Sequence, residues 1–240
     1  MQCSIVLPCY NEAKTLPALF AGFEQATEDW GSIEVIYVNN GSTDETEAVL
    51  NELLAGRPKQ SARLVSIKAN RGYGTGILSG LRAANGQFLG WTHADSQYHP
   101  GIVAEGFKRL LEAKEPAKSF VRGRRTGRGA VDVLFTAGMS LVASLALATR
   151  LDDINGQPKL FPRCFLKLLT GAPSDFSLDL YALYQARQNG YAMIEMPVYF
   201  GKRIHGKAKG GGSLHLKWRL TKRTLKFIKN LRRQVALQVR

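Results

Sequence analysis

The feature that most constrains the fold is an alternation, over the first 123 residues, of short β-branched or aromatic runs with longer stretches of helical periodicity. The predicted strands are 4–8, 34–38, 64–67, 88–91 and one starting at 120–121, and the predicted helices are 15–26, 43–54, 72–86 and 101–113. Ser42 or Thr43 is the expected N-cap of the second helix. This spacing favours an α/β fold whose parallel sheet has helices on both faces, and such sheets bind ligands where their strands end.

Charge is distributed unevenly along the chain, whose net charge is +14. Residues 1–115 contain 10 basic and 13 acidic side chains, whereas residues 116–240 contain 23 basic and 6 acidic ones. The basic half predicts an anionic partner: nucleic acid, an acidic membrane surface or a phosphorylated ligand. The three cysteines form no CxxC pair, which favours a reducing cytoplasm over a disulfide framework or zinc cluster, and the N-terminus shows no signal peptide.

Two segments of the basic half bear on membranes. Residues 133–149 are 17 positions without a charge, slightly short for a span, so a buried or interfacial helix is the preferred interpretation. Residues 213–240 place apolar side chains at helical spacing among many lysines and arginines. This second pattern fits an interfacial anchor or a helix packed on the domain by its apolar stripe, and the sequence favours neither.

Polar segments follow three of the predicted strands: 8–12 (PCYNE), 39–44 (NNGSTD) and 93–97 (HADSQ). All three fall where a parallel sheet places its ligands. One polar turn means little, but three at the same edge predict a binding site.

At this point the sequence resembles a known family. The succession SIVLPCYNEA, VNNGSTDET, NRGYGTGILSGL and ADSQYHP is similar to the inverting family 2 glycosyltransferases of the GT-A fold. The later segments VRGRR (121–125), DINGQPKLF (153–161) and VYFGKR (198–203) resemble the dolichyl-phosphate mannose synthase and polyprenyl-phosphate branch. The resemblance covers roughly residues 3–210, which we expect to form the glycosyltransferase domain, with residues 211–240 as a basic amphipathic appendage.

The resemblance implies a nucleotide-sugar site. Its expected nucleotide-binding residues are Pro8, Tyr10, Glu12, Asn39, Asn40 and Ala94. Asn40 occupies the position at which the family reads the base with a carboxylate. An amide both donates and accepts, which suits a pyrimidine better than guanine, so a pyrimidine donor is expected. The alternative is that Asn39 and Asn40 are only turn residues.

The resemblance also implies a divalent cation on the donor diphosphate. Asp95 matches the second carboxylate of the family's DxD motif, Gln97 matches the next polar position, and His93 stands where the first Asp usually lies. Either Asp95 and Gln97 hold Mg²⁺, or His93 joins them and Mn²⁺ is preferred, or His93 contacts only the sugar.

The acceptor side is implied by basic residues from distant segments. Arg125, Lys159, Arg203 and Lys209 are expected around the acceptor phosphate and the diphosphate. A lipid phosphate needs no general base, whereas a hydroxyl acceptor would; Asp179 is the first candidate for that base and Asp175 the second.

The predicted function is therefore transfer of a sugar to a polyprenyl phosphate by an enzyme peripheral on the cytoplasmic face of a membrane. The alternative enzyme transfers to a hydroxyl of a lipid-linked or surface polysaccharide. A nucleic-acid-binding protein is disfavoured, because the basic half lacks RNA-binding aromatic motifs and a helix-turn-helix.

Overall fold

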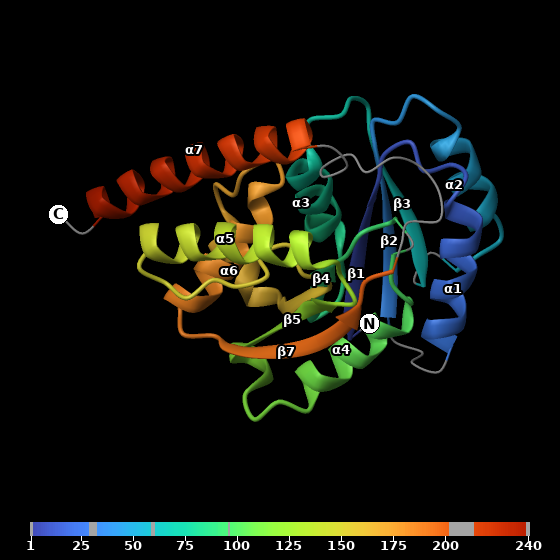
Figure 1. Cartoon of the computed structure of the whole chain (residues 1–240). Helices are drawn as coiled ribbons and strands as arrows, with labels where there is room; N and C mark the ends of the chain where they lie inside the picture. The colour runs from blue at the N-terminus through green and yellow to red at the C-terminus, as the bar shows by residue number, and fades with distance from the viewer. Residues whose placement is uncertain (1, 29–32, 59–60, 96, 202–213, 239–240) are drawn as a thin grey trace.

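The computed structural model describes residues 2–28, 33–58, 61–95, 97–201 and 214–238, and within the last helix it describes side chains for residues 221–233. Strands and helices alternate along most of the chain (Figure 1). The strands are β1 (Cys3–Cys9), β2 (Ile33–Asn40), β3 (Ala62–Ile67), β4 (Phe88–Trp91), β5 (Ser119–Thr126), β6 (Lys159–Pro162) and β7 (Ala192–Tyr199). The helices are α1 (Leu16–Glu28), α2 (Thr46–Leu54), α3 (Tyr73–Ala83), α4 (Gly101–Leu111), α5 (Ala130–Ala146), α6 (Ser177–Gln188) and α7 (Leu214–Gln238), with 3₁₀ turns at Pro116–Lys118 and Arg163–Leu169.

The strands form one sheet in the order β3-β2-β1-β4-β6-β5-β7. β3, β2, β1 and β4 are parallel, as predicted, and β7 is parallel to β5. β6 lies antiparallel between β4 and β5, pairing Lys159 with Trp91 on one side and with Arg122 on the other. The sheet is therefore mostly parallel, and the start of β6 reaches the edge at which β4 ends.

Both faces of the sheet are buried, and β1 shows how the sequence achieves this. Ile5 and Leu7 pack on the face covered by α1, α2 and α4, whereas Val6 packs on the face covered by α3 and α6. All three side chains are fully buried. A strand buried on both faces needs a continuous apolar run rather than an alternating one, which is the pattern of this segment.

The predicted cap of the second helix is wrong. α2 begins at Thr46, and its N-cap position is Glu45, which makes no side-chain capping hydrogen bond. The Ser42 and Thr43 side chains instead bond to Asn11 in the preceding loop. A contact between loops has replaced the local cap that the sequence suggested.

α5 and α7 are both helical, as expected for residues 133–149 and 213–240. α5 buries only its small side chains, Ser140 and Ala143. α7 packs on the domain through Ile228 and Leu231, which belong to the same core cluster as α3 and α6. None of the described helices is long and apolar enough to cross a membrane. The glycines 210–212, a candidate hinge, lie outside the described residues.

Candidate active site

The loops after β1 and β2 are joined by hydrogen bonds centred on Asn11, whose φ is 53°. Its backbone N–H donates to Ser42 Oγ at 3.1 Å, and its Oδ1 accepts the Thr43 backbone N–H at 2.8 Å. The Glu12 backbone N–H donates to Thr46 Oγ1 at 2.9 Å. The two polar segments 8–12 and 39–44 therefore form one continuous wall at the carboxyl edge of the sheet.

Pro8, Tyr10 and Glu12 lie on this wall. Pro8 is in register with Val38 on β2, and all three side chains are only partly buried. The Glu12 carboxylate accepts a hydrogen bond from Thr15 Oγ1 at 3.0 Å. These residues lie together at the carboxyl edge of the sheet, and their expected contacts with a base and ribose remain predictions.

Asn39 and Asn40 are both buried but are used differently. Asn39 Oδ1 accepts the Ser42 backbone N–H at 3.1 Å, and its Nδ2 donates to Glu47 Oε2 at 3.0 Å. The turn role considered for both residues thus describes Asn39. Asn40 Nδ2 donates to the Gly72 carbonyl at 3.1 Å, while its Oδ1 is buried without a partner among the described residues. The Gly72 carbonyl uses one of the two Nδ2 hydrogens of Asn40, and Oδ1 is the acceptor that the described residues leave for a ligand.

The β3–α3 loop borders the site; the sequence of this segment supports the family resemblance, but no site residue was predicted in it. Gly41 has a φ of +68°, and a Cβ built on it would lie 2.2 Å from the Asn70 backbone nitrogen. Gly72 has a φ of +107°, and a Cβ there would lie 2.3 Å from the Ser174 carbonyl oxygen. Only glycine permits both close approaches. The glycine-rich run after β3 was the signal that could have identified this loop.

His93 and Asp95 lie together after β4. His93 Nδ1 is 3.7 Å from Asp95 Oδ2, and His93 Nε2 is buried without a partner among the described residues. Ala94 between them is buried. The Gln97 backbone N–H donates to Asp95 Oδ1 at 3.3 Å, and its side-chain Nε2 donates to the Gly201 carbonyl at 3.0 Å. Within the described ranges no three His, Cys, Asp or Glu side chains form a metal cluster.

Asp179, on the first turn of α6, is the centre of a buried polar network. Its Oδ1 accepts hydrogen bonds from Trp91 Nε1 at 3.1 Å and from Gln157 Nε2 at 2.9 Å. The Lys159 ammonium lies 2.8 Å from the same oxygen. The aspartate is 1% exposed and the lysine 0%. This network brings together β4, β6 and α6, although its members are far apart in the sequence.

The structure gives Lys159 a different place from the expected phosphate contact. Besides Asp179, its Nζ donates to the carbonyls of Ile154 at 3.0 Å and Gly156 at 2.9 Å. Burial lowers the pKa of Lys159 even though the adjacent carboxylate opposes this shift. All three hydrogens of the ammonium are thus directed to protein groups, because the antiparallel β6 turns this side chain into the core.

Tyr73 connects the two halves of the site. Its hydroxyl lies 3.4 Å from Gln157 Nε2, and its ring meets His93 edge-on at 5.6 Å between centroids. The ring also stacks on Phe176 at 4.6 Å. Burial, followed by the charge of Asp179, raises the pKa of Tyr73 well above its usual value. The phenol is therefore a neutral bridge between the His93–Asp95 loop and the Asp179 network.

Arg125 and Arg128 converge on Asp153. Arg125 Nε donates to Asp153 Oδ1 at 2.8 Å, its backbone N–H donates to Oδ2 at 2.6 Å, and Arg128 lies 3.5 Å away. Burial opposes ionisation of Asp153, but the hydrogen bonds and charge of Arg125 outweigh it and lower the pKa of that carboxyl. Burial and the neighbouring Arg125 charge lower the pKa of Arg128. The other expected phosphate ligands, Arg203 and Lys209, lie outside the described residues.

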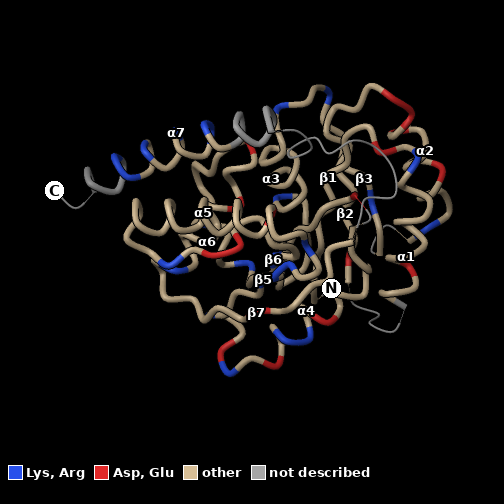
Figure 2. Tube along the Cα trace, in the orientation of Figure 1, with Lys and Arg blue, Asp and Glu red and all other residues tan. Residues whose placement is uncertain are grey.

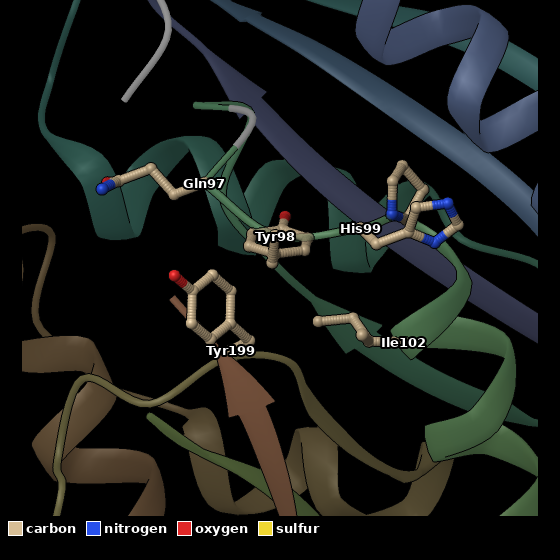
Figure 3. Close-up of a pocket in the computed structure, with 6 residues that line it drawn as sticks. Gln97, Tyr98, His99, Ile102 and Tyr199 are labelled. Carbon is tan, nitrogen blue, oxygen red and sulfur yellow. The ribbon is translucent and has the colours of Figure 1, made fainter. Parts of the chain in front are cut away.

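A shallow pocket of about 390 Å³ opens beside the Asp95 loop (Figure 3). It is lined by Gln97, Tyr98, His99, Pro100, Ile102 and Tyr199. Tyr199 is 72% exposed, and its ring faces this pocket from the end of β7. Aromatic and aliphatic walls with few polar groups suit the apolar face of a ligand.

A sequence profile described as "Glycosyl transferase family 2" matches residues 4–136, more than half of the chain. The chain belongs to glycosyl transferase family 2. The profile spans the loops after β1, β2 and β4, so the family assignment rests on the segments that build the site.

Curated relatives and solved structures agree with this assignment. The chain is 27% identical, over 88% of its length and 90% of theirs, to uncharacterized glycosyltransferases of Mycobacterium tuberculosis and Mycobacterium bovis. A mannosyltransferase from Pyrobaculum calidifontis, solved with GDP-mannose and Mn²⁺, superposes with a TM-score of 0.66 and 22% identity, covering 92% of this chain and 60% of that one. Glucosyl-3-phosphoglycerate synthase from M. tuberculosis, solved with Mn²⁺, UDP and glucosyl-3-phosphoglycerate, gives 0.68 and 20%, covering 93% and 77%.

These structural similarities establish the GT-A fold. The chain corresponds to 60% of the mannosyltransferase's length, so the larger protein has parts without a counterpart here. The names of these proteins do not mention a polyprenyl phosphate acceptor, and the narrower resemblance stays a prediction.

Proposed function

We propose that this family 2 glycosyltransferase moves a sugar from a uridine diphosphate donor to a polyprenyl phosphate at a membrane surface, inverting the anomeric centre. The observation that carries the proposal is the pair of guanidinium groups, Arg125 and Arg128, held on one carboxylate directly before the apolar helix α5. A phosphate acceptor and an apolar lipid tail together match this arrangement.

The donor side fits a divalent cation. His93 Nε2 is a buried, unpartnered ligand atom, and Asp95 supplies a carboxylate beside it. Two protein ligands are too few for a closed metal site, so the remaining ligands would come from the diphosphate and water. The cation, when bound, neutralises charge on the departing diphosphate. The structural neighbours that hold Mn²⁺ support this assignment.

The base preference follows from Asn40. The Gly72 carbonyl takes one Nδ2 hydrogen, and Oδ1 is the acceptor that has no partner among the described residues. Uracil presents one N–H on the edge that a protein reads, whereas guanine presents two, and a single acceptor leaves one of these unpaired. The neighbours include one GDP-mannose complex and several UDP complexes, so the preference rests on Asn40 alone.

The proposed acceptor class is argued from the Arg125–Arg128 pair and from the Asp179 carboxylate. The charge of Arg125 acts against that of Arg128, and the carboxylates of Asp153 and Asp132 oppose this repulsion. An added anion such as a phosphate would relieve the repulsion further. Asp179, the candidate base, is 1% exposed and already accepts three hydrogen bonds on one oxygen, so its carboxylate is engaged by the core. A lipid phosphate is already ionised and needs no proton removed by a base.

The alternative is transfer to a hydroxyl of a lipid-linked or surface polysaccharide. It is favoured by the place of Asp179 at the edge of the site, linked through Tyr73 to the His93 loop. In that reaction Asp179 accepts the hydroxyl proton, and Lys159 is the residue that positions it.

The test is a donor and acceptor screen with the purified protein, reading release of nucleoside diphosphate. UDP-sugars with polyprenyl phosphate should give turnover that stops without the lipid and with EDTA. Turnover with a saccharide hydroxyl or a small phosphorylated acid, and none with polyprenyl phosphate, would overturn the acceptor assignment while leaving the family unchanged.

A further inference from the structure

The exposed large hydrophobic side chains gather on one part of the molecule. Among the described residues they come from α5, from α7 and from the end of β7. Seven of the nine belong to α5: Val131, Val133, Leu134, Phe135, Leu141, Val142 and Leu145. α1, α2 and α4 expose none. A contiguous apolar patch on an otherwise polar protein marks an interaction surface.

The most exposed of these residues form a single stripe. Val131, Leu134, Leu141 and Leu145 are 74%, 76%, 60% and 75% exposed and recur at spacings of three, seven and four residues. Gly138, which falls on the same stripe, has open space around its Cα. These spacings place side chains on one face of an α-helix, so α5 presents an apolar outer face along its length.

α7 runs alongside α5 (Figure 1) and contributes mainly charge, since Leu225 is its only exposed large hydrophobic side chain among the described residues. Its stripe is turned inward: Ile228 and Leu231 are 3% and 4% exposed, and Phe227 meets Tyr181 edge-on. The described basic side chains of α7 are exposed, and Figure 2 shows basic positions spaced along the trace of the helix. The described exposed ones are Lys222, Arg223, Lys226, Lys229, Arg232 and Arg233. Arg223 Nε lies 3.3 Å from Asp175 Oδ2, whereas Lys226, Lys229, Arg232 and Arg233 lie on the outer surface of the helix. The apolar stripe of α7 therefore packs on the domain, and its basic side chains face outward.

We infer that the outer face of α5 is the surface by which the protein enters an anionic lipid bilayer, with α7 lying beside it against the phosphate headgroups. An apolar helix face flanked by lysines and arginines matches the two layers of such a surface, acyl chains and anionic headgroups. The apolar face of α5 would enter the bilayer to a depth of about one helix radius, so that α5 lies in the membrane interface and does not cross the membrane. The inference rests on the membrane part of the proposed function and assigns it to a surface.

A second copy of the chain is the competing occupant of this face. Two copies meeting through α5 would bring their α7 helices, each with six described basic side chains, close to one another. No acidic residue follows Glu195 in the sequence to offset them. The charge beside the face therefore favours an anionic partner over a like-charged one.

The experiment is vesicle co-sedimentation of the full chain without sugar donor. The probes are neutral phosphatidylcholine vesicles and anionic vesicles in which about 30% of the lipid is phosphatidylglycerol. The apolar variant is Leu134→Glu with Leu141→Glu, and its control is Gln25→Glu with Asn51→Glu, which adds the same charge at exposed positions of α1 and α2. The charge variant is Lys226→Gln with Lys229→Gln. Deleting α7 is avoided, because it would uncover the core at Ile228 and Leu231.

The parent should bind anionic vesicles, and the Leu134/Leu141 variant should bind at least tenfold more weakly, with the control unchanged. The Lys226/Lys229 variant should lose roughly fivefold for each charge, and high salt should weaken the parent to a similar extent. UDP affinity, measured in parallel, should be equal in all variants, which shows that they are folded. Unchanged vesicle binding by the Leu134/Leu141 variant overturns the inference, and so does its conversion of a dimeric parent to a monomer with lipid binding intact.

The proposed function is tested separately with a short-chain polyprenyl phosphate in detergent, where no bilayer is needed. Vesicle binding without transfer contradicts the acceptor assignment and leaves the α5 surface standing. Transfer without vesicle binding contradicts the α5 surface and leaves the acceptor assignment standing.

Discussion

Replacing Lys159 by Met tests whether the lysine holds the Asp179 carboxylate in the core. The two groups are 2.8 Å apart and 0% and 1% exposed, so the substitution strands a charge with no access to water. Removing one partner of a buried pair costs about 3–5 kcal/mol. For a chain of this size each kcal/mol lowers the melting temperature by roughly 2–4 °C, so the loss should be on the order of 6–20 °C.

Calorimetry at neutral pH measures this shift, and the double variant Lys159→Met with Asp179→Asn is the control. The second substitution removes the stranded charge while keeping a carbonyl oxygen for Trp91 and Gln157, so it should recover more than half of the loss. A single variant that melts within 2 °C of the parent would show that Lys159 is not the partner on which Asp179 depends.

Three further predictions concern the donor site and the Arg125 cluster. Asp95→Asn should abolish nearly all transfer, because it removes the carboxylate that is expected to hold the cation. His93→Asp should shift the metal preference from Mn²⁺ toward Mg²⁺ if the imidazole is a ligand. Initial rates measured across a series of divalent metals test both substitutions. UDP should bind more tightly than GDP by about 1–3 kcal/mol, roughly 5- to 150-fold, and Asn40→Asp should reverse part of this difference in calorimetric titration. Asp153→Asn should destabilise the fold by about 1–3 kcal/mol at neutral pH. Because the pKa of Asp153 is held below its ordinary 3.8, the stabilisation by Arg125 should be complete above that value and disappear as pH falls through the lowered pKa.

Each of these predictions has a contradicting result. Asp95→Asn activity within a factor of two of the parent removes Asp95 from the metal site, and an unchanged metal profile of His93→Asp places the imidazole outside the ligand set. GDP as the tightest nucleotide contradicts the reading of Asn40. Parallel melting curves of parent and Asp153→Asn between pH 2 and pH 7 contradict the ion-pair account of Arg125.

The sheet edge was predictable from the sequence because its determinants are local. The apolar run of β1 and the polar residues after it are adjacent in the chain, so 8–12, 39–44 and 93–97 were placed correctly without any long-range information. The antiparallel β6 was not predicted, because its four residues are too few to show a periodicity. Its pairing partners are also distant in the sequence: Lys159 pairs with Trp91, 68 positions earlier, and with Arg122, 37 positions earlier. The burial of Lys159 depends on this reversed strand, which explains why resemblance alone assigned the residue to a phosphate.

The two terminal segments show the same limit. Helical periodicity identified 213–240 as a helix, but the choice between an anchoring and a packing stripe depended on whether a groove exists to receive Ile228 and Leu231. Likewise, the sequence of an uncharged run such as 133–149 does not indicate whether the outer face of the helix packs against other residues or is exposed. Only the position of α7 and of the core beneath α5 decides these points.

The reversed direction of β6 has a consequence for how such an enzyme could change its acceptor. The donor loops follow the carboxyl ends of the parallel strands. Because β6 runs in the opposite direction, Gln157 and Lys159 lie at the same edge of the sheet but at the start of their strand. The segment between β5 and β6, which includes α5 and Asp153, is thus tied to the sheet at both of its ends and is separate in sequence from every donor loop. We expect that substitutions, or even changes of length, within 127–156 can alter what is glycosylated, and where in the cell, while leaving the nucleotide site as it is. The donor site and the acceptor site of one enzyme could then evolve at different rates.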